Sequence, residues 1–419
     1  MKTIASFFVL TWFCIGTAYK VYAQTNTLQT QRIDNLAKEL IDKKQAAGID
    51  ILILKDGKPF YSKAFGYADV ERKLPMHTDH IFRIASQTKA ITSLAAMMLW
   101  EEGRFMLDEP VSKYIPDFRN TRVLDKFNAS DSTYTTVPAL REITIRDLFR
   151  HTSGLSYPVF SGNPEINAIY AKAGIATGIG SKGSLKDQIA LLAKQPLVNQ
   201  PGDRFTYGLN SDVLGYLVEI WSGLPLDEFF YKRIFEPLEM KDTYFHLPQQ
   251  KADRLVALSV KNKSDSNYKN VNKLIYEGND PNYPLMKNIY LSGGAGLVST
   301  TADYAKFLTL FLNNGQVGGK RLIGAKTLEL MITNQLANNI IRPGSLQFGL
   351  GVALVTPENK FMQAISIGSF YWGGIFNTHY WVDPKENLIG LIYTQEYDAY
   401  SEDIGHLFKN VIYSTLDNH

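Results

Sequence analysis

The spacing of apolar residues changes along this chain, and each change predicts a different element. Residues 28–47 follow a helical period, with apolar side chains at Ile33, Leu36, Leu40 and Ile41. Two strand-like stretches follow, Asp50–Lys55 and Phe60–Gly66, and the Asp56-Gly57-Lys58 sequence between them is typical of a β-hairpin turn. From Ala90 to Trp100 the residues are apolar on most sides, which predicts a buried helix.

Strand patterns return near the C-terminus. Successive antiparallel strands are predicted at Phe348–Leu354, Ala364–Ile367, Asn377–Val382 and Leu388–Thr394, and a last amphipathic helix at Ser401–Leu416. Residues 113–288, before these strands, show mostly helical patterns and loops. Strands at both ends with helices between them predict a mixed α/β fold, in which both chain ends form one antiparallel sheet flanked by helices and a mainly helical lobe is inserted.

These patterns place residues 24–419 in a single domain. Its sheet lobe would comprise about residues 24–112 and 289–419, and its helical lobe about residues 113–288. A cleft between two lobes is the usual position of a small-molecule site, so we expect the functional residues there.

Residues 1–23 have the pattern of a secretory signal peptide. Lys2 precedes an apolar run from Ile4 to Ala18, and Val21-Tyr22-Ala23 predicts cleavage after Ala23. Cys14, the only cysteine, lies in this segment, so the mature chain would have neither a disulfide nor a thiol nucleophile. We expect a periplasmic or secreted protein; an uncleaved anchor is the alternative, because Lys20 is unusually close to the cleavage site.

Charge and composition narrow the possible partners. Basic residues number 44 and acidic residues 41, without a basic block, so nucleic acid is not an expected partner. No later apolar stretch approaches the length of a membrane span, so stable membrane insertion is not expected after cleavage. His77 and His80 lack a nearby cysteine or third ligand and are expected to be polar loop residues; we predict neither a metal nor a cofactor.

The most informative motif is Ser86-Gln87-Thr88-Lys89, which leads directly into the predicted buried helix. Residues three apart share a helix face, so the Ser86 hydroxyl and the Lys89 amine can touch. A serine hydroxyl becomes a good nucleophile when a neighbouring base takes its proton, and a partly neutral lysine can do so. A solvated lysine beside an N-cap serine would give the same spacing. A second match, Ser266 to Lys269, lies in a polar run and is expected to be a surface loop.

Two later segments also offer chemistry. Tyr207 follows a run of turn residues just before a helical pattern, and a tyrosine near a lysine can act as a general base. A core tyrosine with a bonded hydroxyl is the alternative. Tyr371-Trp372-Gly373-Gly374-Ile375 has two glycines at a strand edge, where the backbone could approach a ligand and an N–H could stabilise an oxyanion. A simple hairpin turn would explain the glycines equally well.

In this order, the segments resemble the serine β-lactamase and penicillin-binding-protein superfamily, and within it the class C β-lactamase-like group. Family-like landmarks extend from about Gly66 to Gln395, nearly the whole mature chain. They include Phe82–Ser86, Leu107–Val111, Leu148–Leu155, Pro201-Gly202 with Phe205–Tyr207, and Gly293–Thr300. The resemblance implies a β-lactamase/transpeptidase-like fold.

The resemblance also implies roles for individual residues. Ser86 would be the nucleophile, Lys89 its activating partner and Tyr207 the second base. Backbone N–H groups of Ser86 and Ile375 would form the oxyanion hole. The missing Gly-x-Ser-x-Gly elbow disfavours an esterase of the α/β-hydrolase fold.

Two departures from the class C pattern direct the functional prediction. Class C β-lactamases carry Tyr-x-Asn, whereas here Leu209 occupies the asparagine position and Asn210 follows. They also carry Lys-Thr-Gly, whose lysine helps to hold the β-lactam carboxylate, whereas this chain has Trp372-Gly373-Gly374. An indole offers an apolar wall and one N–H instead. These features, with Tyr-x-x-x-x-Asp-Val-Leu-Gly at Tyr207–Gly215, resemble family VIII carboxylesterases and related acyltransferases.

The sequence therefore predicts a secreted serine hydrolase that forms an acyl-enzyme on Ser86, first of all a carboxylesterase. Trp372, Gly373, Gly374 and Asn210 are the expected substrate-binding residues, and the substrate would be a small-molecule ester, amide or β-lactam. A β-lactamase or D-amino-acid peptidase is the second interpretation. The third is a penicillin-binding or sensor module that is acylated but hardly turns over. Oligomeric state and acyl group stay open.

Overall fold

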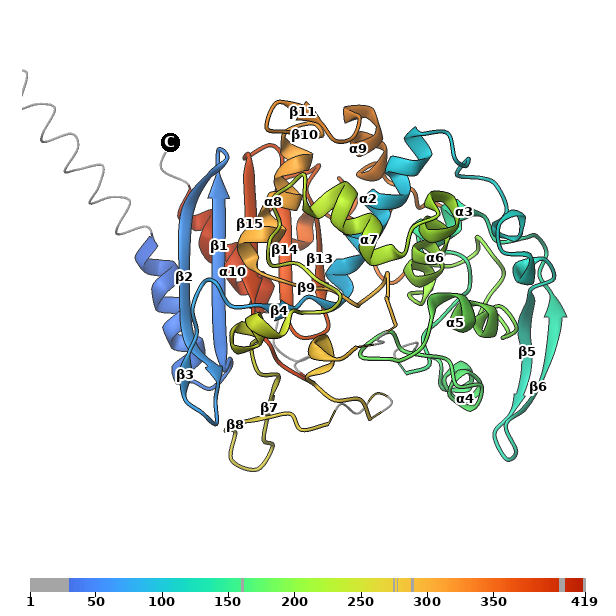
Figure 1. The fold of residues 1–419 in the computed structure, drawn as a ribbon, viewed down its shortest axis with the longest axis horizontal. Coiled ribbons are helices and arrows are strands. Elements are labelled where there is room, and N and C mark those ends of the chain that lie inside the picture. Colours follow the sequence, from blue (N-terminus) through green and yellow to red (C-terminus); the bar gives the residue numbers. More distant parts are fainter. Residues whose placement is uncertain are drawn as a thin grey trace, which may run out of the picture.

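The computed structural model describes residues 30–159, 162–273, 276, 278–287, 290–398 and 404–416, and Figure 1 shows how their elements are arranged. The predicted signal peptide lies outside these residues. Within them, no helix combines the length and the apolar character that crossing a membrane requires.

A seven-stranded antiparallel sheet is built from both ends of the chain, in the order β12-β13-β14-β15-β1-β2-β3. Its strands are β1 (Gly48–Lys55), β2 (Lys58–Asp69), β3 (Leu74–Pro75), β12 (Ala353–Leu354), β13 (Phe370–Gly374), β14 (Thr378–Asp383) and β15 (Leu388–Tyr393). The last strand, β15, pairs with the first, β1, so that Ile51 lies opposite Ile392. The predicted sheet shared by both chain ends is therefore confirmed.

Alternate side chains of β1 pack into two different hydrophobic cores, one on each face of the sheet. Ile51 and Ile53 pack with a helix at residues 30–42 and with α10 (Ile404–Ser414) on one face. Leu52 belongs to a larger core with α2 (Thr88–Glu101) and α8 (Thr301–Leu312) on the other face. Successive strand residues point to opposite sides of a sheet, so a strand covered on both faces is apolar throughout.

The segment between α2 and β9 (Val298–Ser299) holds most of the other helices, which lie beside the sheet in Figure 1. These are α3 (Ile145–Phe149), α4 (Pro164–Lys172), α5 (Leu185–Leu192), α6 (Asn210–Ser222) and α7 (Leu226–Phe230). The same segment contains two hairpins that the sequence analysis did not predict, β5 (Arg122–Asn128) with β6 (Thr133–Pro138) and β7 (Ser259–Lys261) with β8 (Tyr268–Asn270). The remaining strands are β4 (Phe82–Arg83), β10 (Gln316–Val317) and β11 (Lys320–Arg321), and α9 (Ala325–Met331) precedes β12.

Two of the predicted C-terminal strands need correction. Ala364–Ile367 forms a loop, because the Ser366 N–H donates to the Asp383 carboxylate at 2.9 Å instead of to a neighbouring strand. Gly368, at φ +92°, then turns the chain into β13. Phe348–Leu354 contributes only the two residues of β12.

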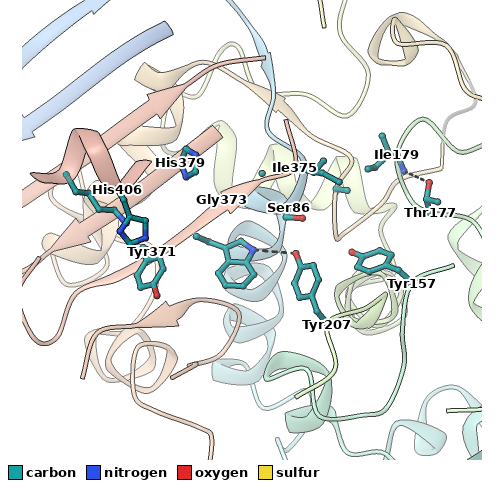
Figure 2. Close-up of a pocket in the computed structure, with 14 residues that line it drawn as sticks. Ser86, Tyr157, Thr177, Ile179, Tyr207, Tyr371, Gly373, Ile375, His379 and His406 are labelled. Carbon is teal, nitrogen blue, oxygen red and sulfur yellow. Dashed lines mark hydrogen bonds between the residues drawn. The ribbon is translucent and has the colours of Figure 1, made fainter. Parts of the chain in front are cut away.

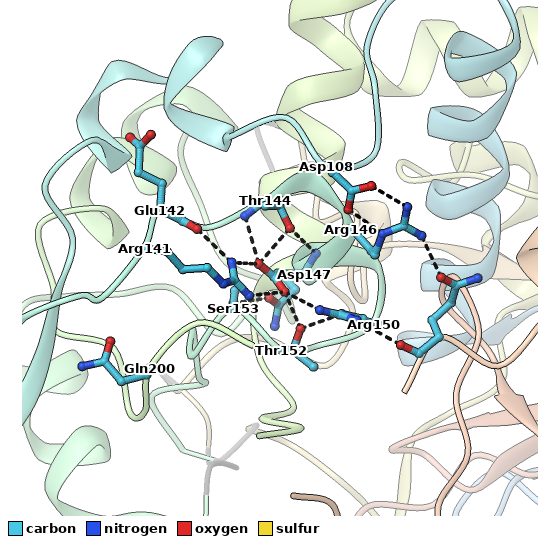
Figure 3. A network of polar contacts seen from close by, with 12 residues as sticks. Asp108, Arg141, Glu142, Thr144, Arg146, Asp147, Arg150, Thr152, Ser153 and Gln200 are labelled. Carbon is cyan, nitrogen blue, oxygen red and sulfur yellow. Dashed lines mark hydrogen bonds and ion pairs between the residues drawn. The ribbon is translucent and has the colours of Figure 1, made fainter. Parts of the chain in front are cut away.

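The buried carboxylate of Asp147 holds helix α3 and the turn after it in place (Figure 3). Asp147 in α3 forms a capping box with Thr144 and ion pairs with Arg141 at 2.6 Å and Arg150 at 3.0 Å. Burial alone would raise the pKa of Asp147, but the hydrogen bonds from Arg141 and Thr144 outweigh it and lower the pKa to about 2. The Thr152 hydroxyl also donates to Asp147 at 2.7 Å, so the network holds the turn that follows α3.

Candidate active site

Ser86 lies in a short 3₁₀ turn, Ala85–Gln87, immediately before α2. Strand β4 precedes this turn and is anchored by the buried Arg83, whose guanidinium donates to the carbonyls of Pro281 and Val256. Ala85, directly before the serine, has φ +43°, a left-handed conformation that costs a non-glycine residue about 1–3 kcal/mol. The surrounding core therefore enforces the backbone that delivers Ser86 to the start of the helix.

Lys89 is fully buried one turn after Ser86. Its Nζ donates to Ser86 Oγ at 3.2 Å, to Tyr157 Oη at 3.0 Å and to the Gly294 carbonyl at 2.8 Å. The predicted i, i+3 contact is thus present. The alternative of a solvated lysine beside an N-cap serine is excluded, because Lys89 is buried and Gln87 occupies the N-cap of α2.

Two tyrosines approach this pair, and the sequence analysis assigned a catalytic role to one of them. Tyr207 places its ring 4.7 Å from Lys89 Nζ, and its hydroxyl accepts a long hydrogen bond of 3.4 Å from Trp372 Nε1. Tyr157 instead provides the hydroxyl that Lys89 contacts directly. Tyr157 was not among the predicted catalytic residues, because its proximity to Lys89 depends on the turn at Gly154, where φ is +86°.

Burial keeps Tyr157 in its neutral form. Desolvation, with the nearby Tyr207 and Asp212, raises the pKa of Tyr157 well above its usual value. Burial also raises the pKa of Asp212, although a hydrogen bond from Ser292 at 2.6 Å opposes that effect. Because Tyr157 stays protonated, it is a hydrogen-bonding partner for Lys89 and a poor general base.

The strand edge predicted at Trp372-Gly373-Gly374 packs against the turn that carries Ser86. A Cβ on Gly374 would lie 2.4 Å from the Ile84 carbonyl, so only glycine permits this approach. All three residues and Ile375 line the same cavity as Ser86. The two residues predicted to supply oxyanion-hole N–H groups, Ser86 and Ile375, therefore line the same cavity.

The structure places Asn210 outside that cavity, which corrects its predicted role in substrate binding. Asn210 is the first residue of α6 and is fully buried. Its side chain bonds the Ser153 hydroxyl through Oδ1 and His151 Nδ1 through Nδ2, the latter at 3.0 Å. Asn210 is thus a structural residue that ties α6 to the turn at His151–Gly154.

The cavity has a volume of about 460 Å³. Figure 2 shows Ser86 and Ile375 near its middle, Tyr157, Thr177 and Ile179 on one side, and Tyr371, His379 and His406 on the other. Sequence analysis missed the lining residues Thr177, Ile179, Ala295, His379, His406 and Lys409. They come from segments that only the tertiary fold brings together, and only Ala295, in the Gly293–Thr300 landmark, lies in a motif that the sequence analysis used.

Nothing in the described part of the chain resembles a metal centre, since no group of three or more His, Cys, Asp or Glu side chains gathers there. The polar atoms at Ser86 are a hydroxyl, a lysine amine and two phenols. This set suits nucleophilic attack on a carbonyl with proton transfer.

Comparison with known proteins agrees with this chemistry. The family model described as Beta-lactamase matches residues 33–406. The chain belongs to the β-lactamase family. Protein Rv1367c of Mycobacterium tuberculosis is 31% identical over 377 residues, which cover 87% of this chain and 90% of that protein. Esterase EstB of Burkholderia gladioli is 26% identical over 391 residues, which cover 91% of this chain and 95% of that protein.

A solved structure also supports the β-lactamase fold. EstCE1, described as a hydrolase with promiscuous acyltransferase activity, aligns with a TM-score of 0.77 and 25% identity, over 93% of this chain and 99% of its own. With the family match and the esterase relative, this likeness identifies the chain as an enzyme of the serine hydrolase or acyltransferase type on a β-lactamase fold.

Proposed function

We propose that this β-lactamase-family enzyme is a carboxylesterase that works through an acyl-enzyme on Ser86. Ser86 Oγ attacks the ester carbonyl as its proton passes to Tyr207 or Lys89, and the N–H groups of Ser86 and Ile375 hold the oxyanion. Collapse of the tetrahedral intermediate expels the alcohol, which takes up that proton. Water then attacks the acyl-serine and releases the carboxylic acid.

The observation that carries this proposal is the cavity wall at Trp372. In a class C β-lactamase a lysine at this position contacts the substrate carboxylate. Here the indole lines the cavity and its Nε1 donates to Tyr207. An indole N–H carries no charge, so the wall beside Ser86 favours a neutral ester group over a carboxylate.

The test compares two chromogenic substrates. Purified enzyme should hydrolyse short p-nitrophenyl esters with a clearly higher kcat/KM than a chromogenic cephalosporin. Efficient cephalosporin turnover with negligible ester hydrolysis would show a β-lactamase instead. Stoichiometric acylation by penicillin, with almost no turnover of either substrate, would show a penicillin-binding or sensor module.

Matched serine variants test the nucleophile. Ser86→Ala should abolish hydrolysis and labelling by a fluorophosphonate probe, because loss of one member of a nucleophilic set typically lowers kcat by about 10⁴ to 10⁶. Ser266→Ala is the control, since Ser266 belongs to the other Ser-x-x-Lys match and lies exposed between β7 and β8. Retained labelling in Ser86→Ala would refute the assignment.

Export completes the proposal, and it rests on the sequence of residues 1–23 alone. We infer that the mature enzyme is periplasmic or secreted and begins after Ala23. N-terminal sequencing of enzyme recovered from the periplasm or the medium tests this. An intact N-terminus in the membrane fraction would indicate the uncleaved anchor.

A further inference from the structure

Ile375, whose N–H is expected to complete the oxyanion hole, lies in a short turn between two strands. β13 ends at Gly374 and β14 begins at Thr378, and these two residues lie opposite each other in the sheet. The Asn377 N–H closes the turn by donating to the Gly374 carbonyl at 3.0 Å. Only three residues connect the strands, so the direction of the Ile375 N–H depends on how this turn is held.

Asn377 is the residue at which the turn rejoins the sheet. Its φ of +63° is left-handed, which is typical of the last residue of a three-residue hairpin loop. Asparagine tolerates this conformation better than most residues, but glycine adopts it without steric cost. The backbone alone therefore does not explain an asparagine here. Its side chain offers a reason, because Asn377 is buried and its amide is hydrogen-bonded at both atoms.

The Asn377 amide bonds two neighbouring segments. Nδ2 donates to Glu396 Oε2 at 3.2 Å, so the acceptor Oδ1 faces His379, whose Nε2 donates to it at 2.8 Å. Glu396 is itself held, because its Oε1 accepts from the Ala47 N–H at 2.9 Å, directly before β1. One side chain thus connects the turn to β14 and to the segment that follows β15.

The backbone of the turn is bonded to that same segment. Thr394 Oγ1 donates to the Asn377 carbonyl at 2.9 Å, and the Glu396 N–H donates to the Phe376 carbonyl at 3.1 Å. These contacts hold the second and third residues of the turn. The first residue, Ile375, is therefore oriented by neighbours that are fixed on the side away from the cavity.

The other side of the turn contacts the segment that carries the nucleophile. Phe376 is fully buried and shares one apolar cluster with Ala85, the residue before Ser86. Ile375 packs against this cluster and lines the same cavity as Ser86 (Figure 2). A change in the turn would therefore move the Ile375 N–H relative to the serine.

We propose that Asn377 is a positioning residue that orients the Ile375 N–H toward the carbonyl oxygen of the bound ester. The inference rests on the proposed esterase function and adds a residue to it. An oxyanion donor depends on geometry, since it must lie about 2.7–3.1 Å from the oxygen that becomes negative in the transition state. Asn377 lies outside the described cavity lining, so its effect should appear in kcat and not in KM.

The experiment compares Asn377→Gly with the wild-type enzyme in two measurements. The first gives kcat and KM for p-nitrophenyl butyrate. The second gives the inhibition constant of 1,1,1-trifluorohexan-2-one, whose carbonyl carbon bonds to Ser86 Oγ as the hydroxyl proton passes to the base, which leaves a tetrahedral oxyanion. Glycine permits the left-handed backbone and removes only the side-chain contacts.

The expected losses are similar in both measurements. Removing a whole oxyanion donor lowers kcat about 10²- to 10³-fold, so a donor that is only loosened should lower kcat by about tenfold to a hundredfold. KM should stay nearly unchanged, because the ground-state ester makes little use of this donor. The ketone should bind more weakly by a factor similar to the loss of kcat, because its oxyanion needs the same N–H.

Asn387→Gly is the matched control. Asn387 is also left-handed, at φ +47°, and lies in the turn between β14 and β15, at the opposite end of β14 from the cavity. Its replacement should leave kcat and ketone binding at their wild-type values. If Asn377→Gly does not fold, Thr394→Val takes its place, because it removes the hydroxyl that donates to the Asn377 carbonyl and keeps the side-chain volume. Both kcat and ketone affinity should then fall together.

The outcomes separate this proposal from the esterase proposal. Wild-type kcat in Asn377→Gly would overturn it, as would a loss of kcat without weaker ketone binding or equal losses in Asn387→Gly. If no ester is hydrolysed in a Ser86-dependent way, the esterase proposal fails instead, and the rate of fluorophosphonate labelling of Ser86 decides. Slower labelling in Asn377→Gly alone would support the role, because the phosphonyl oxygen needs the same donors. Equal labelling rates would refute it, and no labelling of the wild-type enzyme would refute both proposals.

Discussion

Replacing Tyr207 by phenylalanine would remove one hydroxyl from the cavity and leave the aromatic ring in place. The ring packs 4.8 Å from His151, 5.7 Å from Tyr157 and 5.6 Å from Trp372, measured between ring centres. Lys89 Nζ stands over the same ring, and a phenylalanine face attracts a cation as well. We therefore expect the variant to fold with Lys89 in its present position.

The expected magnitudes follow from these contacts. The hydrogen bond from Trp372 to the Tyr207 hydroxyl, at 3.4 Å, is longer than the usual 2.7–3.2 Å, so its loss should lower the free energy of unfolding by less than about 1 kcal/mol. Loss of a general base typically lowers turnover about 10²- to 10⁴-fold, which raises the barrier by about 3–5 kcal/mol. The predicted change is large in turnover and small in stability.

Tyr157→Phe is the matched comparison, because it removes the hydroxyl that accepts from Lys89 at 3.0 Å. Tyr157 is protonated through burial, so it cannot take the serine proton. Its removal leaves one N–H of the buried Lys89 side chain without its present acceptor, which costs about 1–3 kcal/mol. We expect a lower melting temperature and a smaller loss of turnover than in Tyr207→Phe.

The assay is ester hydrolysis under saturating substrate, together with the melting temperature of wild type and both variants. Near-wild-type turnover in Tyr207→Phe would refute its role as the base. The reversed pattern, with the larger kinetic loss in Tyr157→Phe, would transfer the role to Tyr157 and contradict the argument from its raised pKa.

Two further predictions concern pH. The pKa of Asp147 is lowered to about 2 in the folded protein, from 3.8 in the unfolded chain. At pH values above 3.8, Asp147 therefore stabilises the fold by about 2 kcal/mol, and this contribution is lost as pH falls through 2. Asp147→Asn should therefore be less stable to urea at pH 7, with the difference shrinking below pH 4; an equal difference at both pH values would contradict this. Asp50 has the opposite effect, because burial raises its pKa to about 7 despite the hydrogen bond from Thr301. The free energy of unfolding of the wild-type protein should therefore fall by up to about 4 kcal/mol as pH rises from 4 to 7. Asp50→Asn should raise the melting temperature at pH 8 and not at pH 4, and no dependence on pH would show that Asp50 does not titrate.

The sheet could be predicted where its strands are buried and continuous. The β1–β2 hairpin and strands β14 and β15 follow from apolar runs and a turn sequence, and their pairing follows from both chain ends contributing strands. The β5–β6 hairpin was missed although threonine and tyrosine favour strands, because its residues are mostly exposed and lack an apolar stripe. The Ala364–Ile367 error has a related cause, since Ile365 is buried but Ile367 is 51% exposed and faces no core.

The candidate site was predictable only where the chemistry is local in sequence. Ser86 and Lys89 lie one helical turn apart, so their contact follows from helix geometry. Asn210 was misassigned because its distance from Tyr207 in sequence says nothing about which way its side chain points; in the structure it bonds His151 and Ser153. Lys409 is more than 300 residues from Ser86, so no spacing rule could place it in the same cavity.

The residue at position 372 carries the proposed choice between an ester and a β-lactam. In the class C pattern, a lysine on the strand beside the nucleophile would hold an anion next to the reacting carbonyl. Here Trp372 lies at that position and its Nε1 donates to Tyr207. An indole carries no charge, so a β-lactam would place its carboxylate against an apolar wall, whereas the neutral ester of the proposed reaction would not.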